Sequence, residues 1–82
     1  MTLSSIVKPT LNGITIVCSN DMVRMCISDR LSKMGLRLVI NMDSFEDFPC
    51  IFIQRDGKNY YTKSAGYGNC KVYKSDDIFW IE

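Results

Sequence analysis

The chain has 82 residues, of which 46% are hydrophobic, and its ten basic and nine acidic side chains leave a formal net charge of +1. This length accommodates one small globular domain, residues 1–82, and is too short for two. Because the net charge is close to zero, the composition excludes a protein-wide field that would attract nucleic acid or an anionic membrane. Any electrostatic partner must therefore be recognised locally.

The composition also bears on location and on metal chemistry. No apolar run approaches the ~20 residues that a membrane-spanning helix needs, and the first ten residues lack the apolar core of a secretory signal. The four cysteines are irregularly spaced and the chain has no histidine. This pattern predicts buried, reduced thiols in a cytoplasmic protein, with no metal site and no cofactor. The cysteines are Cys18, Cys26, Cys50 and Cys70.

The N-terminal third predicts an arm, a strand and a helix. Residues 1–10 show no sustained hydrophobic period, which predicts an irregular arm or a short edge strand ended by Pro9. After the turn signal Asn12-Gly13, the β-branched run at 14–18 predicts a central strand. Ser19 or Asn20 can then cap a helix, because a short side-chain oxygen accepts a bond from an orphan amide of the first turn.

Apolar residues in this helix recur at intervals of three and four, which predicts one face packed on a sheet and an end near Met34, before Gly35. Met25 lies away from the apolar stripe, so we expect it to be exposed. The stripe consists of Val23, Cys26, Ile27, Leu31 and Met34. The residues predicted to face water are Asp21, Arg24, Ser28, Asp29, Ser32 and Lys33.

The next three strands carry the clearest local signals. Residues 36–42 alternate in polarity, which predicts a strand with one face inward, parallel to the first strand if the two are neighbours in the sheet. Two β-prone runs flank Asp56-Gly57, a pair that favours a type I′ turn, and they predict a hairpin. Its register pairs Ile53 with Tyr60 and Ile51 with Thr62, and we expect this face to be the core face.

A last hairpin is predicted from 70–74 and 78–81, after a glycine-flanked loop at 64–69. The predicted order is therefore β-α-β-β-β-β-β. This order belongs to the α+β class, with a single helix packed on one face of a mixed, mostly antiparallel sheet.

The sequence contains no recognisable set of catalytic residues. The absence of histidine removes the commonest general base, and we interpret the two acidic clusters, at 43–47 and 76–77, as solvated turns. The Gly-x-Gly of the loop at 64–69 is not followed by the residues of a phosphate-binding motif. We therefore expect a protein that is not an enzyme.

Two candidate binding features remain: a basic, tyrosine-bearing segment at 55–74 and an apolar C-terminus at 78–81. Lysines can track phosphates while aromatic rings stack on bases, which would suit single-stranded RNA or DNA. The alternative interpretation is that the lysines protect a sheet edge and the tyrosines pack as strand residues. The candidate nucleic-acid residues are Arg55, Lys58, Tyr61, Lys63, Lys71, Tyr73 and Lys74.

The favoured hypothesis is a non-enzymatic binding protein that docks on another protein as an inhibitor, adaptor or regulator. In its size and plain composition the chain resembles the small accessory proteins that large phages encode. Tryptophan and tyrosine are the usual anchors of protein interfaces, and an exposed edge strand could also pair with its own copy to form a homodimer. The candidate contact residues are Met25, Tyr67, Tyr73, Phe79 and Trp80.

Overall fold

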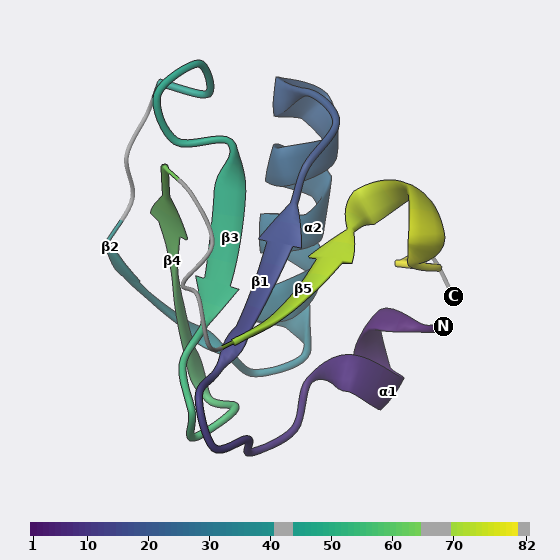
Figure 1. Cartoon of the computed structure of the whole chain (residues 1–82), viewed down its shortest axis with the longest axis vertical. Coiled ribbons are helices and arrows are strands. Elements are labelled where there is room, and N and C mark those ends of the chain that lie inside the picture. Colours follow the sequence, from purple (N-terminus) through teal and green to yellow (C-terminus); the bar gives the residue numbers. More distant parts are fainter. Residues whose placement is uncertain (41–43, 65–69, 81–82) are drawn as a thin grey trace.

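The structure is a computed structural model that describes residues 1–40, 44–64 and 70–80 (Figure 1). One main helix, α2, lies against a five-stranded sheet, and a one-turn helix, α1, lies beside the C-terminal segment. In chain order the elements are α1 (Leu3–Ile6), β1 (Ile14–Val17), α2 (Asp21–Lys33), β2 (Arg37–Ile40), β3 (Cys50–Ile53), β4 (Asn59–Lys63), β5 (Lys71–Lys74) and a short 3-10 turn, η1 (Ser75–Asp77).

The strand order in the sheet is β2-β4-β3-β1-β5. The β1–β3 and β3–β4 pairs are antiparallel, whereas β1–β5 and β2–β4 are parallel. The predicted α+β class, with one helix on a mixed sheet, is confirmed. The expected excess of antiparallel pairs is not, because two of the four ladders are parallel. β1 and β2 run in the same direction but are not neighbours, since β3 and β4 lie between them.

The predicted last hairpin is wrong for the described residues. After β5 the chain turns through η1, and Phe79 forms an isolated parallel bridge with Thr2 instead of pairing with β5. The buried Ser75 holds this turn against the connection between β1 and α2, because its Oγ accepts a hydrogen bond from the backbone N–H of Ser19 at 3.1 Å. β5 pairs with β1 on one side, and the chain beyond it leaves the sheet.

The β3–β4 hairpin has the predicted register, with Ile53 opposite Tyr60 and Ile51 opposite Thr62. The predicted type I′ turn is wrong, because that turn needs a positive φ at both central residues and only Gly57, at +69°, has one. The Gly57 N–H instead donates to the Gln54 carbonyl at 3.0 Å, and Gly57 takes the left-handed conformation that closes the hairpin. Asp56 Oδ1 accepts bonds from the backbone N–H groups of Lys58 and Asn59. Local turn chemistry therefore sets this hairpin.

The core lies between the sheet and α2. Its members are almost completely buried and come from the sheet, from both helices and from the segments next to them. They are Leu3, Ile6, Ile14, Ile16, Cys18, Ile27, Leu31, Leu36, Ile51, Ile53, Tyr60 and Ile78. Cys18 and Cys50 are buried, but Cys26 and Cys70 are only half-buried, so the predicted burial of the cysteines holds for two of the four.

Two predictions at the helices were wrong. The N-terminal arm is a helical turn, because Leu3 and Ile6, three residues apart, point to the same side and enter the core. Arg24 does not face water: only 6% of it is exposed, and its Nη1 donates to the carbonyl of Phe48 at 2.8 Å. That acceptor comes from the turn at 44–48, which the periodicity of the helix cannot reveal.

Candidate protein-docking surface

The exposed side of α2 carries two methionines. Met22 and Met25 lie three residues apart, on the same side of the helix, and are 74% and 62% exposed. Asp29 follows one turn further along and forms an ion pair with Lys33, with 3.0 Å between Oδ2 and Nζ. We call Met22, Met25 and Asp29 the α2 ridge. The predicted exposure of Met25 is confirmed.

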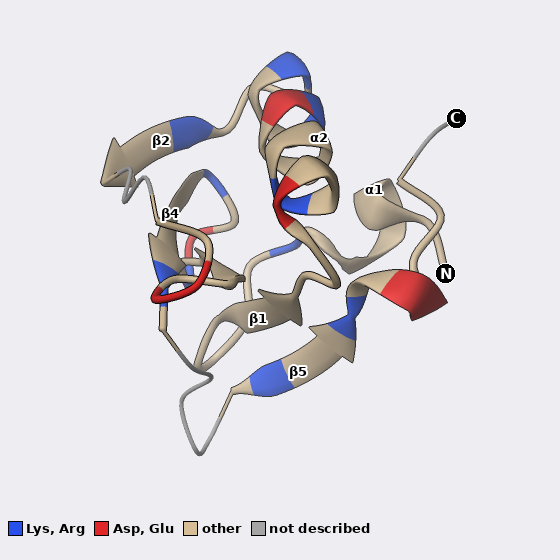
Figure 2. Cartoon of the chain, turned by 90° about the horizontal axis from the view of Figure 1, so that it is seen from above, with Lys and Arg blue, Asp and Glu red and all other residues tan. Residues whose placement is uncertain are grey.

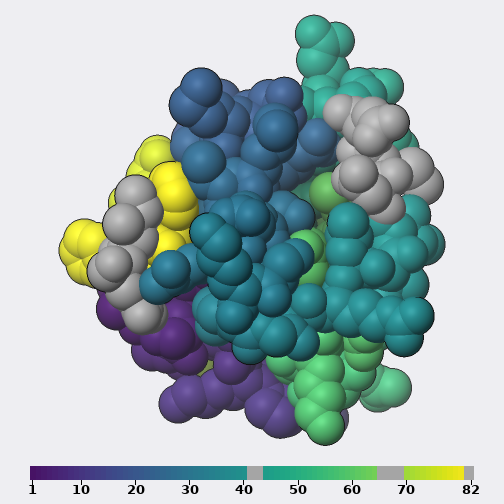
Figure 3. Space-filling view, turned by 180° about the vertical axis from the view of Figure 1, so that it is seen from behind, coloured from purple at the N-terminus to yellow at the C-terminus, as the bar shows by residue number. Residues whose placement is uncertain are grey.

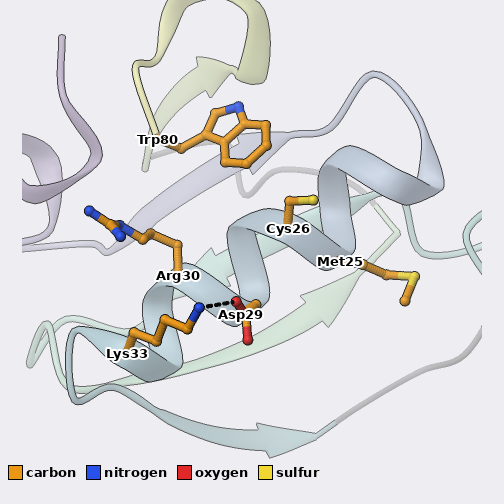
Figure 4. A pocket seen from close by; sticks show the side chains of 6 residues that line it. All are labelled: Met25, Cys26, Asp29, Arg30, Lys33 and Trp80. Atoms are coloured by element: carbon orange, nitrogen blue, oxygen red, sulfur yellow. Dashed lines mark ion pairs between the residues drawn. The ribbon is translucent and has the colours of Figure 1, made fainter. Parts of the chain in front are cut away.

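A groove of about 490 Å³ lies between the ridge and the C-terminal segment. Figure 4 shows the indole of Trp80 facing the helix above Cys26, while the side chain of Met25 points away on the other side. Two cations, Arg30 and Lys33, lie on the turns of α2 nearest its C-terminal end. The lining residues of this Trp80 groove are Met25, Cys26, Asp29, Arg30, Lys33 and Trp80.

A second groove, of about 290 Å³, lies on the other flank of α2. In the space-filling view, atoms of β4 are visible at the bottom of the gap between α2 and β2 (Figure 3). The Tyr60 hydroxyl lies there, 2.9 Å from the hydroxyls of both Ser28 and Ser32. The lining of this Leu38 groove is Arg24, Met25, Ser28, Asp29, Ser32, Leu38, Tyr60 and Thr62. Met25 and Asp29 therefore line both grooves.

The other predicted contact residues differ in how far they are exposed. Phe79 is 69% exposed, and its backbone is held by the N-terminus, because its N–H donates to the Met1 carbonyl and its carbonyl accepts from the Leu3 N–H. Trp80 is half-buried and packs against the core while lining its groove. Tyr73 is half-buried against the core. Tyr67 lies outside the described residues.

The structure does not bring the predicted nucleic-acid residues onto one surface. Tyr61 and Lys63 lie on the sheet face opposite α2, where they flank Phe52: the Tyr61 ring is 5.3 Å and Lys63 Nζ 5.1 Å from its ring centre. Phe52 itself is 7% exposed, which leaves little of its ring for a base. Lys74 shares this face, two strands away from β3.

The remaining members of that set lie elsewhere. Arg55 and Lys58 belong to the β3–β4 turn, and the β1–β5 register places Lys71 and Tyr73 on the α2 side of the sheet. Figure 2 shows the basic residues distributed around the molecule, with several on α2 and a single one, Arg37, on β2. Among these, Arg30 and Lys33 line the Trp80 groove, and the sequence reasoning did not single them out.

The sequence reasoning also missed Met22, Cys26 and Leu38. The helical period that exposes Met25 also exposes Met22, so that residue was within reach of the same argument. Leu38 belongs to a strand with alternating polarity, but each residue of β2 is exposed, because this strand is at the edge of the sheet. Cys26 lies in the predicted apolar stripe and borders the Trp80 groove only because residues 78–80 return beside α2.

Within the described residues, no three His, Cys, Asp or Glu side chains are grouped so that they could hold a metal ion. Over the same ranges, no helix combines the length and apolarity needed to cross a membrane.

Comparison of this chain with protein-family models, with curated proteins and with solved structures found no match. The surface chemistry of the chain itself is therefore the basis for a functional proposal.

Proposed function

We propose that this chain is a cytoplasmic, non-enzymatic binding protein that docks on another protein, as an inhibitor, adaptor or regulator, through the α2 ridge and its two grooves. One observation carries the proposal. Met25 is largely exposed and lines both grooves, and Trp80, from the far end of the chain, forms the facing wall of the larger one.

The chemistry of this surface suits a protein partner. Methionine is unbranched and polarizable, so an exposed Met22–Met25 pair can adapt to the shape of an apposed apolar surface. Tryptophan is enriched among the residues that dominate binding energy, and grooves on either side of a ridge can each accept a side chain. The Trp80 groove is lined by two cations, Arg30 and Lys33, and by one anion, Asp29, which pairs with Lys33. This excess of positive charge favours a partner segment in which an acidic residue accompanies an apolar anchor.

The test compares capture by the wild-type chain with capture by three variants. We expect Met25→Asp and Trp80→Ala to lose the same bound protein, because the first places a charge on the ridge and the second removes the groove wall. Leu11→Asp is the matched control, since Leu11 is 83% exposed and lines neither groove. Circular dichroism and thermal melting of each variant check that it is folded.

Calorimetry of the purified chain with the purified partner should then show binding. Met25→Asp should weaken the binding free energy by at least ~2 kcal/mol, as at an interface hot spot. Equal loss in the Leu11→Asp control would count against this surface.

The nucleic-acid hypothesis predicts a different outcome. Labelled single-stranded RNA or DNA would bind with an affinity that falls steeply with salt, and Lys63→Ala would weaken it while Met25→Asp would not. Fluorescence anisotropy distinguishes the two hypotheses.

A further inference from the structure

Acidic side chains gather at the end of the molecule where α2 begins. Two segments are bonded to this end: the turn at 44–48, whose Phe48 carbonyl accepts from Arg24 at 2.8 Å, and η1, whose Ser75 hydroxyl accepts from the Ser19 N–H at 3.1 Å. Figure 1 shows both segments at the same end of the molecule as the start of α2. The exposed acids of this acidic end are Asp21, Glu46, Asp47, Asp76 and Asp77.

Basic side chains gather at the opposite end, where α2 stops. Lys33 is in the last turn of α2, and Arg37 begins β2 soon afterwards. The β3–β4 turn lies at this end, because the Arg37 N–H donates to the Lys58 carbonyl at 2.8 Å, and the Thr10 N–H donates to the Arg55 carbonyl at 3.0 Å. The exposed bases of this basic end are Lys8, Lys33, Arg37, Arg55 and Lys58, and Asp56 is an acid among them.

The α2 ridge lies between these two ends. Its Met22 and Met25 are 74% and 62% exposed. On the sheet face opposite α2, by contrast, Lys63 and Lys74 offset the charge of the acidic end. The α2 face therefore combines exposed methionines with a negative charge at one end and a positive charge at the other.

A face with this charge pattern is complementary to a second copy of itself. If two α2 helices pack face to face and antiparallel, the acidic end of each copy meets the basic end of the other, and the methionines of the two ridges meet between them. A two-fold axis makes the same contact twice. Antiparallel packing also brings the start of each helix dipole near the end of the other. A parallel pairing would set like charges together, which costs free energy.

We propose that a second copy of this chain covers the α2 face, with the two α2 helices antiparallel across a two-fold axis, so that self-association hides the docking surface until a partner displaces it. The competition with a partner rests on the proposed docking function, whereas the pairing itself does not. The 13 residues of α2 span about 20 Å, so the interface belongs to the small class that associates weakly and reversibly.

Sedimentation velocity of the purified chain, from micromolar to near-millimolar concentration at low salt, tests the pairing. We expect the mass to rise from 9.4 kDa toward twice that value. Met25→Asp should raise the dimer dissociation constant about tenfold or more, because it places like charges near the two-fold axis. Val72→Asp is the matched control and should leave the constant unchanged, since Val72 is 54% exposed on the face opposite α2. A monomer throughout the range, or equal effects of the two variants, would overturn the proposal.

Two charge-reversed chains test the antiparallel arrangement. One carries Lys33→Glu and Arg37→Glu at its basic end, and the other carries Glu46→Lys and Asp47→Lys at its acidic end. Each chain alone should dimerise more weakly than the wild type, because each then brings like charges together at both contacts. An equal mixture should recover the dimer, since every reversed end meets an end of opposite charge. No recovery in the mixture would rule out this arrangement.

The pairing and the docking function can fail separately. If the purified chain stays a monomer, the pairing is wrong, while capture of a partner through Met25 can still succeed. If the chain dimerises through α2 but no captured protein depends on Met25, the pairing stands and the docking function is wrong. A captured partner that binds the dimer without dissociating it would overturn the competition.

Discussion

At the scale of single residues, Tyr60 links the core to the Leu38 groove. Its ring is 1% exposed, as the hairpin register predicted for this face, while its hydroxyl donates to the Ser28 carbonyl at 3.0 Å and lies 2.9 Å from the Ser28 and Ser32 hydroxyls. The sequence placed the ring correctly. The partners of the hydroxyl come from α2, and only the packing of the helix on β4 makes them neighbours.

Tyr60→Phe should therefore lower the free energy of unfolding by about 1–2 kcal/mol, because it leaves polar groups of α2 without the partner they have in the fold. Ser32→Ala should cost less, since the tyrosine hydroxyl keeps both of its contacts with Ser28. Urea denaturation measures both. A Tyr60→Phe variant as stable as the wild type would mean that solvent replaces these bonds without loss.

Cys18 makes stability depend on pH in the alkaline range. Burial, together with the nearby Cys50, raises the pKa of this thiol from 9.0 to about 12, although the Arg24 charge opposes the shift. The folded state therefore keeps the proton after the unfolded state has lost it. The contribution of the Cys18 thiol to the free energy of unfolding is fully present below pH 9 and is lost as the pH rises from 9 toward 12.

The expected slope for Cys18 is about −1.4 kcal/mol of unfolding free energy per pH unit within that window. Denaturation curves at several pH values, for the wild type and for Cys18→Ala, isolate this contribution, because all other groups titrate in both proteins. The variant should show the shallower decline. Parallel declines would mean that the folded thiol ionises at its ordinary pKa.

At the scale of elements, α2 begins where a side chain caps it. Asn20 has an extended backbone, and its Oδ1 accepts a hydrogen bond from the Val23 N–H at 2.9 Å. The sequence left Ser19 and Asn20 as alternatives, since both residue types cap helices. The structure selects Asn20, because its Oδ1 makes the capping bond, whereas the Ser19 backbone N–H donates to the Ser75 hydroxyl.

Asn20→Ala should reduce stability by about 1 kcal/mol, the usual cost of losing such a cap. Ser19→Ala is the matched control and should change stability little, because the bond from the Ser19 backbone to Ser75 remains. Thermal unfolding followed by circular dichroism compares them. Equal losses at the two positions would show that the Asn20 cap contributes nothing specific.

At the scale of the whole molecule, the two ends of the chain stabilise each other. Leu3 is 1% exposed, and its N–H donates to the Phe79 carbonyl at 2.9 Å, so α1 both fills the core and holds the C-terminal segment that carries Trp80. Figure 1 shows α1 beside this segment. The Trp80 groove therefore depends on residues from opposite ends of the sequence.

Leu3→Ala should destabilise the fold by about 2–5 kcal/mol through the cavity it leaves. The same substitution at Leu11, which is 83% exposed, should change stability by no more than ~0.5 kcal/mol. Chemical denaturation compares two identical changes in one chain. Similar effects at the two sites would contradict the packing of α1.

The sequence by itself determined the local elements of this protein. The 3.6-residue period of α2, the left-handed glycine after Asp56 and the alternation that pairs Ile53 with Tyr60 are each specified by residues close together in the chain. The exposure of Met25 followed from the same period, so the centre of the candidate surface was predictable.

Only the tertiary structure decided which elements meet. The strand order, the burial of Arg24 under the 44–48 turn, the entry of α1 into the core and the return of Trp80 beside α2 all join residues far apart in sequence. The physical reason is that hydrophobic burial is not directional. The hydrophobic periodicity of a helix or strand therefore predicts which of its faces is buried, but it does not predict which other element covers that face. Edge position, and with it the exposure of β2, is a property of the assembled sheet.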